Sequence, residues 1–436
     1  MTASGLVRAG QFNQASRQGA YILIALALPR LGVSRELIGE WETLLFLGFL
    51  LGFGWTSGLL QGFLVQMGVL TEPHAGRFSR TAVQVMAGIS ALILGSVALL
   101  RDPFFALLQI ETVPVGWYLF FLLLLSRWPS YCFEQALLLR GQARALIVYA
   151  VINAAGLLLS LLLPLYLGAS MLQAMQVLGA FAGAKVVAVL LWTLLPRRAS
   201  TTVEPNPTSE QFQEWMKLSR PLVAYASVAA LVTAADPWVV NYWYDGDPEV
   251  FALFRYGVRE LPLLAALISG MTVVAIPLIT RDRAAGLLEL RKQSRKVFHY
   301  LFLLALAMML TADSWWTRVF TPTFADSLPI FRTFLLVVGC RVVFAMSVLT
   351  ALTQTRQIYL WGVLELAVNI VLSLLLAPRY GLVGIVWGTV LASYFHEACL
   401  VLYLRYRTGI RWREFADLRW YFAYVTALFA AYYWMQ

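Results

Sequence analysis

Charged side chains sit within strongly apolar stretches of this sequence, where their chemistry matters most. The stretch LLLLSRWPSYCFEQALLLRG, residues 122–141, carries Arg127, Tyr131 and Glu134 at spacings of four and three, which places them on one face of a helix. Arg127 and Glu134 would lie about 10 Å apart along the helix axis, too far for an ion pair within the helix. Each therefore needs a partner. Either neighbouring helices pair with both charges as fixed structural contacts, or the charges line a water-filled cavity, which is the interpretation we favour.

The segment 9–30 indicates a second polar face. Its uninterrupted apolar run, Gly19 to Pro29, is only 11 residues long, whereas a helix needs about 20 residues to cross the hydrocarbon layer. The spanning helix must therefore include the polar residues that precede this run, which are Gln11, Asn13, Gln14, Arg17 and Gln18. A face this polar is unfavourable against lipid, so we expect it to face a cavity.

Further charges fall inside other apolar segments. Lys185 either faces the cavity or extends its amine to the membrane surface. The second half contributes Asp236, Arg255, Arg259, Glu260, Arg332, Arg341, Glu365, His396 and Glu397. Arg255 and Arg259 share a helix face, whereas Arg332 and Arg341 lie on opposite faces, so at least one of the latter two is structural. Basic residues outnumber acidic ones among these buried charges, and guanidinium groups bind phosphate in a forked geometry, which favours an anionic cargo.

Membrane-spanning helices must position these groups. Of 436 residues, 60% are hydrophobic and 13% are charged, and apolar runs of roughly 18 to 25 residues recur along the chain. We predict an all-α polytopic membrane protein with twelve spans, at about 9–30, 38–66, 81–100, 114–138, 145–166, 172–195, 218–243, 252–279, 297–312, 328–352, 358–377 and 382–404.

The spans divide into two lobes. The lobes, residues 1–195 and 218–404, are joined by a Pro-, Ser- and Thr-rich cytoplasmic linker at 196–217 and followed by a basic interfacial segment, 405–436, that ends in a candidate thirteenth helix. GQARALIVYAVINAAGLLLSLLLPLYLG from Gly141 resembles TQTRQIYLWGVLELAVNIVLSLLLAPRYG from Thr353. We therefore predict pseudo-symmetric lobes related as a parallel repeat, able to rock about a cavity.

Basic residues also set the orientation. Of the 33 Lys and Arg residues, 21 lie in segments that are cytoplasmic if the N-terminus is inside, and five lie outside. The net charge of +10 is thus explained by topology, and we expect no nucleic-acid partner. The three cysteines lie in apolar runs without metal-ligand spacing and are predicted to be packing residues. Gly54, Gly58 and Gly62 are predicted to allow close helix packing.

Three stretches resemble polysaccharide flippases of the Wzx type, in the multidrug/oligosaccharidyl-lipid/polysaccharide (MOP) exporter superfamily. They are ALPRLGVSRELIGEWETLLFLGFL (27–50), PEVFALFRYGVRELPLL (248–264) with Asp236 before it, and APRYGLVGIVWGTVLASY (377–394). The likeness covers residues 5–405. It departs from the family where Asp236 is followed by Pro237 rather than a basic residue, which puts its coupling role in doubt, and in a count of 13 helices, where relatives usually have 12 or 14.

The resemblance implies a flippase that moves undecaprenyl-pyrophosphate-linked oligosaccharide across the bacterial inner membrane by alternating access, driven by a proton or sodium gradient. It implies no enzymatic activity, no cofactor and no metal, and its expected partners are the lipid-linked glycan, membrane lipid and a polysaccharide polymerase or ligase. We assign the substrate cavity to Arg17, Arg127, Arg255, Arg259, Lys185, Arg341, Gln11, Asn13, Gln14 and Tyr131. Asp236 and Glu134 are assigned to ion coupling.

Two other functions are considered. A multidrug or cation antiporter of the same superfamily would be expected to have an acidic cavity, and the basic excess argues against it. A membrane glycosyltransferase, polymerase or ligase needs a sizeable extracytoplasmic loop, but the longest predicted one, around residues 313–328, has no paired carboxylates and no histidine.

Overall fold

The computed structural model describes residues 3–70, 74–194, 209–259, 275–276 and 278–435. Within these ranges every regular element is a helix. The chain divides into two compact units, Met1–Ala230 and Leu231–Gln436. Most of the predicted linker 196–217, most of the predicted span 252–279 and Glu260 lie outside the described residues.

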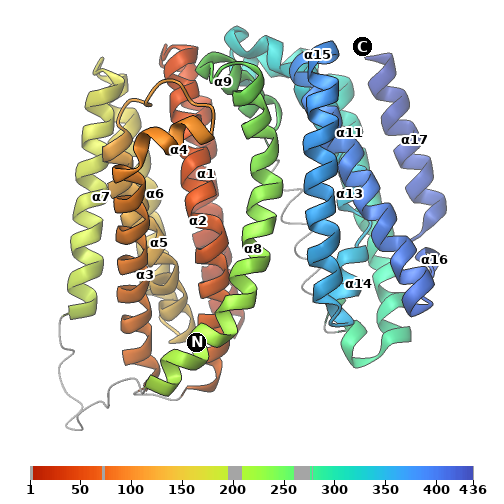
Figure 1. Cartoon of the computed structure of the whole chain (residues 1–436), viewed down its shortest axis with the longest axis horizontal. Coiled ribbons are helices and arrows are strands. Elements are labelled where there is room, and N and C mark those ends of the chain that lie inside the picture. Colours follow the sequence, from red (N-terminus) through yellow and green to blue (C-terminus); the bar gives the residue numbers. More distant parts are fainter. Residues whose placement is uncertain (1–2, 71–73, 195–208, 260–274, 277, 436) are drawn as a thin grey trace. The chain divides into compact units, whose positions relative to one another are not determined.

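The first unit is a bundle of long helices (Figure 1). Its helices are α1 (Ala3–Arg30), α2 (Arg35–Val69), α3 (His74–Leu99), the short α4 (Arg101–Leu107), α5 (Trp117–Leu139), α6 (Ala143–Tyr166), α7 (Met171–Leu194) and the first part of α8 (Ser209–Trp243). Helix α1 packs mainly on α6, and α5 packs on α3, α7 and α2. The bundle therefore sets α5, with its charged residues, among several neighbours.

Helix α2 approaches α8 closely because glycines remove the side chains that would separate them. Gly54, Gly58 and Gly62 face α8, and a Cβ atom added at Gly58 would lie 2.4 Å from the backbone nitrogen of Val223. The indole nitrogen of Trp215 in α8 donates a hydrogen bond of 3.0 Å to the backbone oxygen of Leu59. These contacts confirm the close packing predicted from the glycine spacing.

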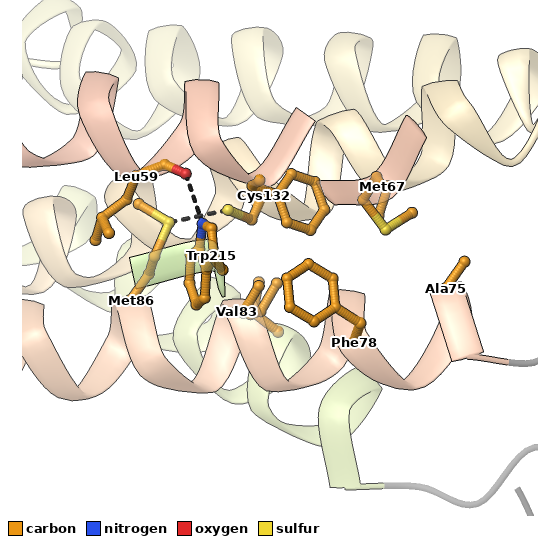
Figure 2. Packing of buried hydrophobic residues seen from close by; sticks show 12 residues of the cluster. Leu59, Met67, Ala75, Phe78, Val83, Met86, Cys132 and Trp215 are labelled. Atoms are coloured by element: carbon orange, nitrogen blue, oxygen red, sulfur yellow. Dashed lines mark hydrogen bonds between the residues drawn. The ribbon is translucent and has the colours of Figure 1, made fainter. Parts of the chain in front are cut away.

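Buried apolar side chains join α2, α3, α5 and α8 in one cluster, which Figure 2 shows from close by. The rings of Phe63 and Phe78 stack at a centroid distance of 5.8 Å, and Trp215 meets Phe78 edge-on at 5.6 Å. The thiol of Cys132 is fully buried and lies 3.0 Å from the sulfur of Met86. Cys132 is therefore a packing residue, as predicted.

The second unit contains shorter and broken helices. Besides the end of α8, it consists of α9 (Pro248–Gly257), α11 (Arg283–Phe320), a 3-10 turn (Pro322–Ser327), α12 (Leu328–Leu335), α13 (Val338–Arg341), α14 (Ala345–Ala351), α15 (Thr355–Tyr403), a π-helical turn (Leu404–Thr408), α16 (Trp412–Phe415) and α17 (Leu418–Trp434). The predicted span 328–352 lies almost entirely within the candidate membrane-spanning segment Pro322–Ala351, but it is divided into α12, α13 and α14 instead of forming one helix. Phe344, in the left-handed region at φ 58°, marks one break. Most of this segment is buried in protein, where non-helical backbone is tolerated at membrane depth.

Helix α15 reverses direction at Gly381, whose φ of 58° and ψ of −138° are not helical. The first limb (residues 355–380) and the second limb (residues 382–403) then lie against each other. A Cβ atom at Gly388 would lie 2.2 Å from the hydroxyl oxygen of Ser373, and one at Gly384 would lie 2.4 Å from the backbone oxygen of Leu376. The two limbs correspond to the predicted spans 358–377 and 382–404.

Helix α17 runs along α11. Near its start, the Tyr421 ring lies 5.9 Å from that of Phe298. Near its end, the backbone oxygen of Met435 accepts a hydrogen bond from Arg332, which is paired with Asp313 of α11. The two helices therefore run in the same direction over about 20 Å, so the C-terminal segment lies lengthwise beside a candidate span. The ion pair also gives Arg332 a structural role.

Eight segments of the described chain are long and apolar enough to cross a membrane. One of them, Arg356–Thr408, contains both limbs of α15. Helices α1 and α5 are not among the eight. These two helices carry the polar residues that sequence reasoning placed at a cavity.

Replacing Gly58 by alanine tests the contact between α2 and α8. Alanine in place of a helical glycine ordinarily stabilises by about 0.5–1 kcal/mol, but at Gly58 the new methyl group would meet the backbone of α8. We expect Gly58→Ala to lower the melting temperature of the detergent-solubilised protein. Gly88→Ala, where nothing lies within 4 Å of the added Cβ atom, should leave it unchanged or raise it. Equal melting temperatures for the two variants would contradict the close approach.

Candidate functional site

A cavity of about 370 Å³ opens in the first unit, lined by α1, α2 and α5. Helix α2 forms a largely apolar wall, whereas α1 and α5 supply charge and aromatic rings. The polar lining consists of Arg17, Tyr21, Thr56, Ser57, Arg127 and Tyr131. No carboxylate is among the lining residues of this cavity. Its charged surface is therefore purely cationic.

Two tyrosines hold Arg127 at the cavity. Nε of Arg127 donates to the hydroxyl of Tyr131 at 2.8 Å, and Nη1 donates to the hydroxyl of Tyr21 at 3.0 Å. The guanidinium also lies over the Tyr21 ring, 5.0 Å from its centroid. Among the described residues no carboxylate makes a direct ion pair with Arg127, and Glu134 interacts with it electrostatically without a hydrogen bond.

Glu134 neutralises the second arginine of the lining. Its Oε2 accepts hydrogen bonds from Nη1 of Arg17 at 3.0 Å and from Nδ2 of Asn13 at 2.7 Å. The guanidinium of Arg17 lies 4.9 Å from the centroid of the Tyr131 ring. The partner that Glu134 requires is thus supplied by α1. Of the polar face predicted for this helix, Asn13 and Arg17 contact α5, whereas Gln11, Gln14 and Gln18 are exposed. Glu134 itself is buried behind the lining rather than in it.

Small residues of α2 leave room beside these arginines. A Cβ atom at Gly52 would lie 2.3 Å from the indole nitrogen of Trp128, and one at Gly48 would lie 2.9 Å from Leu124. Trp128 is buried and meets Trp55 edge-on at 5.4 Å. Gly48 and Gly52 therefore let α2 pack directly on α5 at the cavity wall.

The other predicted site residues of the first unit lie outside the cavity lining. Lys185 donates a hydrogen bond of 2.7 Å to Asn153 and lies 5.5 Å from the centroid of the Tyr149 ring, between α7 and α6. Gln11 and Gln14 are exposed on α1. Asn13 contributes indirectly, through Glu134.

The predicted cavity residues of the second half belong to the second unit. Arg255 is half-buried on α9, and the guanidinium of Arg259 lies 4.9 Å from the centroid of the Tyr256 ring. Arg341 is exposed at the end of α13. The structure thus groups Arg17, Arg127 and Tyr131 at one cavity in the first unit, and places Arg255, Arg259 and Arg341 in the second unit.

Asp236 lies in a buried polar cluster of the second unit. Its Oδ2 accepts a hydrogen bond from the hydroxyl of Thr389 on the second limb of α15. Asn369 on the first limb donates to the same hydroxyl at 3.5 Å, and Ser373 donates to Asn369 at 3.0 Å. Oδ1 of Asp236 has no hydrogen-bond partner in the described protein. The cluster therefore offers a carboxylate oxygen to a proton or a small cation.

Three residues of these sites were not predicted from the sequence: Tyr21, Asn369 and Thr389. Tyr21 holds Arg127, and its place four residues after Arg17 was a usable signal. Asn369 and Thr389 reach Asp236 only because α15 folds back on itself, which spacing along the chain does not reveal.

Within the described residues, no group of three or more His, Cys, Asp or Glu side chains is arranged to hold a metal ion.

Comparison with solved structures identifies the fold. The lipid II flippase MurJ in an inward closed conformation superimposes with a TM-score of 0.67 at 14% identity, covering 98% of this chain and 91% of that one. A multidrug resistance MATE family transporter of the MOP superfamily, inward-facing, gives 0.55 at 12% identity, with 99% and 96% covered. The chain shares its fold with these two proteins.

A third structure supports the same assignment. A MOP superfamily transporter from Pyrococcus furiosus gives a TM-score of 0.57 at 10% identity, with 93% of this chain and 95% of that chain covered. No protein-family model and no curated protein matches the sequence. The chain therefore shares the all-α fold of these membrane proteins, and at these identities the likeness concerns the fold alone.

A double-mutant cycle tests whether Arg17 and Glu134 act as a pair. Glu134 is buried and Arg17 is partly exposed, so we expect Glu134→Gln and Arg17→Gln each to lower the free energy of unfolding, with a coupling of about 1–3 kcal/mol between them. The exposed pair Arg101–Asp102, at 2.7 Å, is the control and should give a coupling of about 0–1 kcal/mol. The measurement is reversible unfolding in detergent. If the two substitutions change the free energy of unfolding additively, Arg17 and Glu134 do not stabilise the protein as an ion pair.

Proposed function

We propose that this chain is a flippase for a lipid-linked oligosaccharide with a pyrophosphate group, of the undecaprenyl-pyrophosphate type. It carries this substrate across the bacterial inner membrane by alternating access, with its N-terminus in the cytoplasm. The observation that carries the proposal is the cationic cavity in which Arg127 has a positive charge without a carboxylate partner in the described chain. A bound pyrophosphate would supply the missing negative charge.

The geometry of Arg127 leaves donors for such a ligand. A guanidinium group carries five N–H donors, and the two hydrogen bonds to Tyr131 and Tyr21 use Nε and one hydrogen of Nη1. The second hydrogen of Nη1 and both hydrogens of Nη2 remain. Arg17, whose Nη1 faces Glu134, adds further donors from the same lining. Two adjacent guanidinium groups suit two linked phosphates.

The polarity of the cavity argues against the drug or cation antiporter. A cationic cargo favours carboxylates, whereas the lining contains two arginines and no carboxylate. In the Pyrococcus furiosus transporter, reverse polarity of the binding pocket suggests a different function. Pocket polarity is thus the feature by which we choose the flippase over the antiporter. The similarity to MurJ, a lipid II flippase, supports a lipid-linked substrate.

Asp236 is the coupling residue in this proposal. It is a buried carboxylate contacted by Thr389 and has a second oxygen without a partner. A buried carboxylate binds a proton or a cation more readily than it stays charged and alone. Arg255, Arg259 and Arg341 are proposed as the second-unit residues for the anionic substrate. A polysaccharide polymerase or ligase is the expected downstream partner.

Replacing Arg127 by glutamine should weaken binding of a polyprenyl pyrophosphate to the purified protein by about tenfold or more, because a charge-assisted hydrogen bond contributes roughly 1.5–3 kcal/mol. Arg127→Lys keeps the positive charge but loses the forked guanidinium geometry, so its affinity should lie between those of wild type and Arg127→Gln. Arg101→Gln, which removes an exposed arginine away from the cavity, is the control. Tryptophan fluorescence titration measures the affinity. Equal affinities for wild type and Arg127→Gln would disprove the assignment of Arg127.

In cells, neutralising Arg127 and Arg255 together should abolish surface glycan at normal protein levels. The physical reason is the loss of one proposed substrate-binding charge from each unit. Immunoblotting of the protein and gel analysis of the glycan measure the two quantities. Normal glycan output from the double variant would refute the proposed substrate residues.

Replacing Asp236 by asparagine should separate binding from coupling. Asparagine keeps the shape and can still accept from Thr389, so the protein should bind polyprenyl pyrophosphate as well as wild type does. Gradient-driven transport into proteoliposomes should fall at least about tenfold, because the residue can no longer take up a proton or cation. Transport that still responds fully to the imposed gradient would remove Asp236 from the coupling mechanism.

A further inference from the structure

A second group of titratable side chains lies in the second unit, and neither the cavity nor Asp236 accounts for it. Glu365 on the first limb of α15 faces His396 on the second limb, with Oε2 of the glutamate 3.1 Å from Nδ1 of the imidazole. The side chain of His396 is only 6% exposed. Ser393 donates to the other oxygen of Glu365 at 3.2 Å. The pair is thus enclosed and geometrically fixed.

Two polar atoms of this group lack a partner. Nε2 of His396 and Oε2 of Glu397 are buried and make no hydrogen bond to the described protein. Leaving such atoms unsatisfied is unfavourable by several kcal/mol at membrane depth. Their presence indicates a site with spare hydrogen-bonding capacity for an exchangeable ligand.

The charges of the group are out of balance by one. Glu365 and Glu397 carry two negative charges, and Arg341, which interacts electrostatically with both, carries one positive charge. With a neutral His396 the formal sum is −1, and one added proton makes it zero. Among the described residues, Asp236, Cys340, Tyr394 and Tyr421 also face this cluster. Asp236, which the sum leaves out, adds a further negative charge when ionised, and none of the four adds a positive charge.

A polar stripe links this group to Asp236. Glu365, Asn369 and Ser373 recur every four residues on the first limb of α15, and Thr389, Ser393 and Glu397 do so on the second. The stripes meet where Ser393 donates to Glu365 and where Asn369 donates to Thr389. Thr389 in turn donates to Asp236. Polar contacts therefore run along the seam between the limbs.

We propose that Glu365, His396 and Glu397 form a proton-binding site, joined to Asp236 through the seam of α15. The proton comes from a hydronium ion, which leaves as water, and is held between Oε2 of Glu365 and Nδ1 of His396, forming one O–H or N–H bond. The same bond breaks when the proton returns to a water molecule as hydronium. No other reactant is needed. The inference deepens the proposed function, on which it rests, because it makes the coupling ion a proton.

Infrared spectroscopy of the purified full-length protein tests this site without any substrate. On acidification, the absorption of protonated carboxyl groups should grow, and Glu365→Gln should remove part of that growth and lower proton uptake by about one per chain. His396→Asn, which keeps a side-chain N–H for Glu365, should shift the transition to more acidic solution. Asp326→Asn removes an exposed carboxylate of the same unit and should leave the buried band unchanged.

An identical buried-carboxyl transition in wild type, Glu365→Gln and Glu397→Gln would overturn the proposal. If Glu365→Gln does not fold, His396→Asn decides, because an unshifted transition in that variant overturns the proposal equally. Suppose that Glu365→Gln loses the transition while Arg127→Gln binds polyprenyl pyrophosphate as wild type does. The proton site would then stand, and the proposed substrate would be rejected. The reverse combination would keep the flippase and reject this site.

Discussion

The free-energy penalty of burying charge at bilayer depth governs this molecule. An isolated ion is several kcal/mol unfavourable there, so each charged side chain needs a partner that determines where its helix lies. Glu134 ties α5 to α1 through Arg17 and Asn13, and Arg332 ties α12 to α11 through Asp313. Against this background a guanidinium held only by two phenols is an exception. Exceptions of this kind are where a membrane protein keeps its binding capacity.

The two units accommodate buried polar and charged side chains in different ways. In the first, long helices pack through glycines and aromatic rings, and the polar groups gather at one cavity. In the second, the polar groups lie along a seam between two limbs of one helix and consist mainly of carboxylates, hydroxyls and an imidazole. A cationic cavity suits an anionic cargo, and a carboxylate seam suits a small positive ion. This division of chemistry is consistent with a carrier whose cargo and driving ion differ in sign.

Periodicity and apolar run length predicted most of the helices, because span length is set by the bilayer. Arg17, Arg127 and Tyr131 were predicted as cavity residues for the same reason, since their charge and spacing exclude lipid. Partners were harder to predict. The contacts of Tyr21, Thr389 and Asn369 depend on which helices are neighbours, and the breaks at residues 336–344 depend on burial by the rest of the unit. Neither quantity is encoded in local sequence.

The reversal of α15 at Gly381 has a mechanical consequence. With Gly384 and Gly388 pressed against the first limb, the limbs have no room to slide, and separating them would expose hydroxyls and carboxylates to hydrocarbon. The hairpin must therefore travel as one stiff piece whenever its surroundings rearrange. The non-helical joints between α12, α13 and α14 lie against this hairpin, so the second unit sets a broken helix beside a tightly paired one.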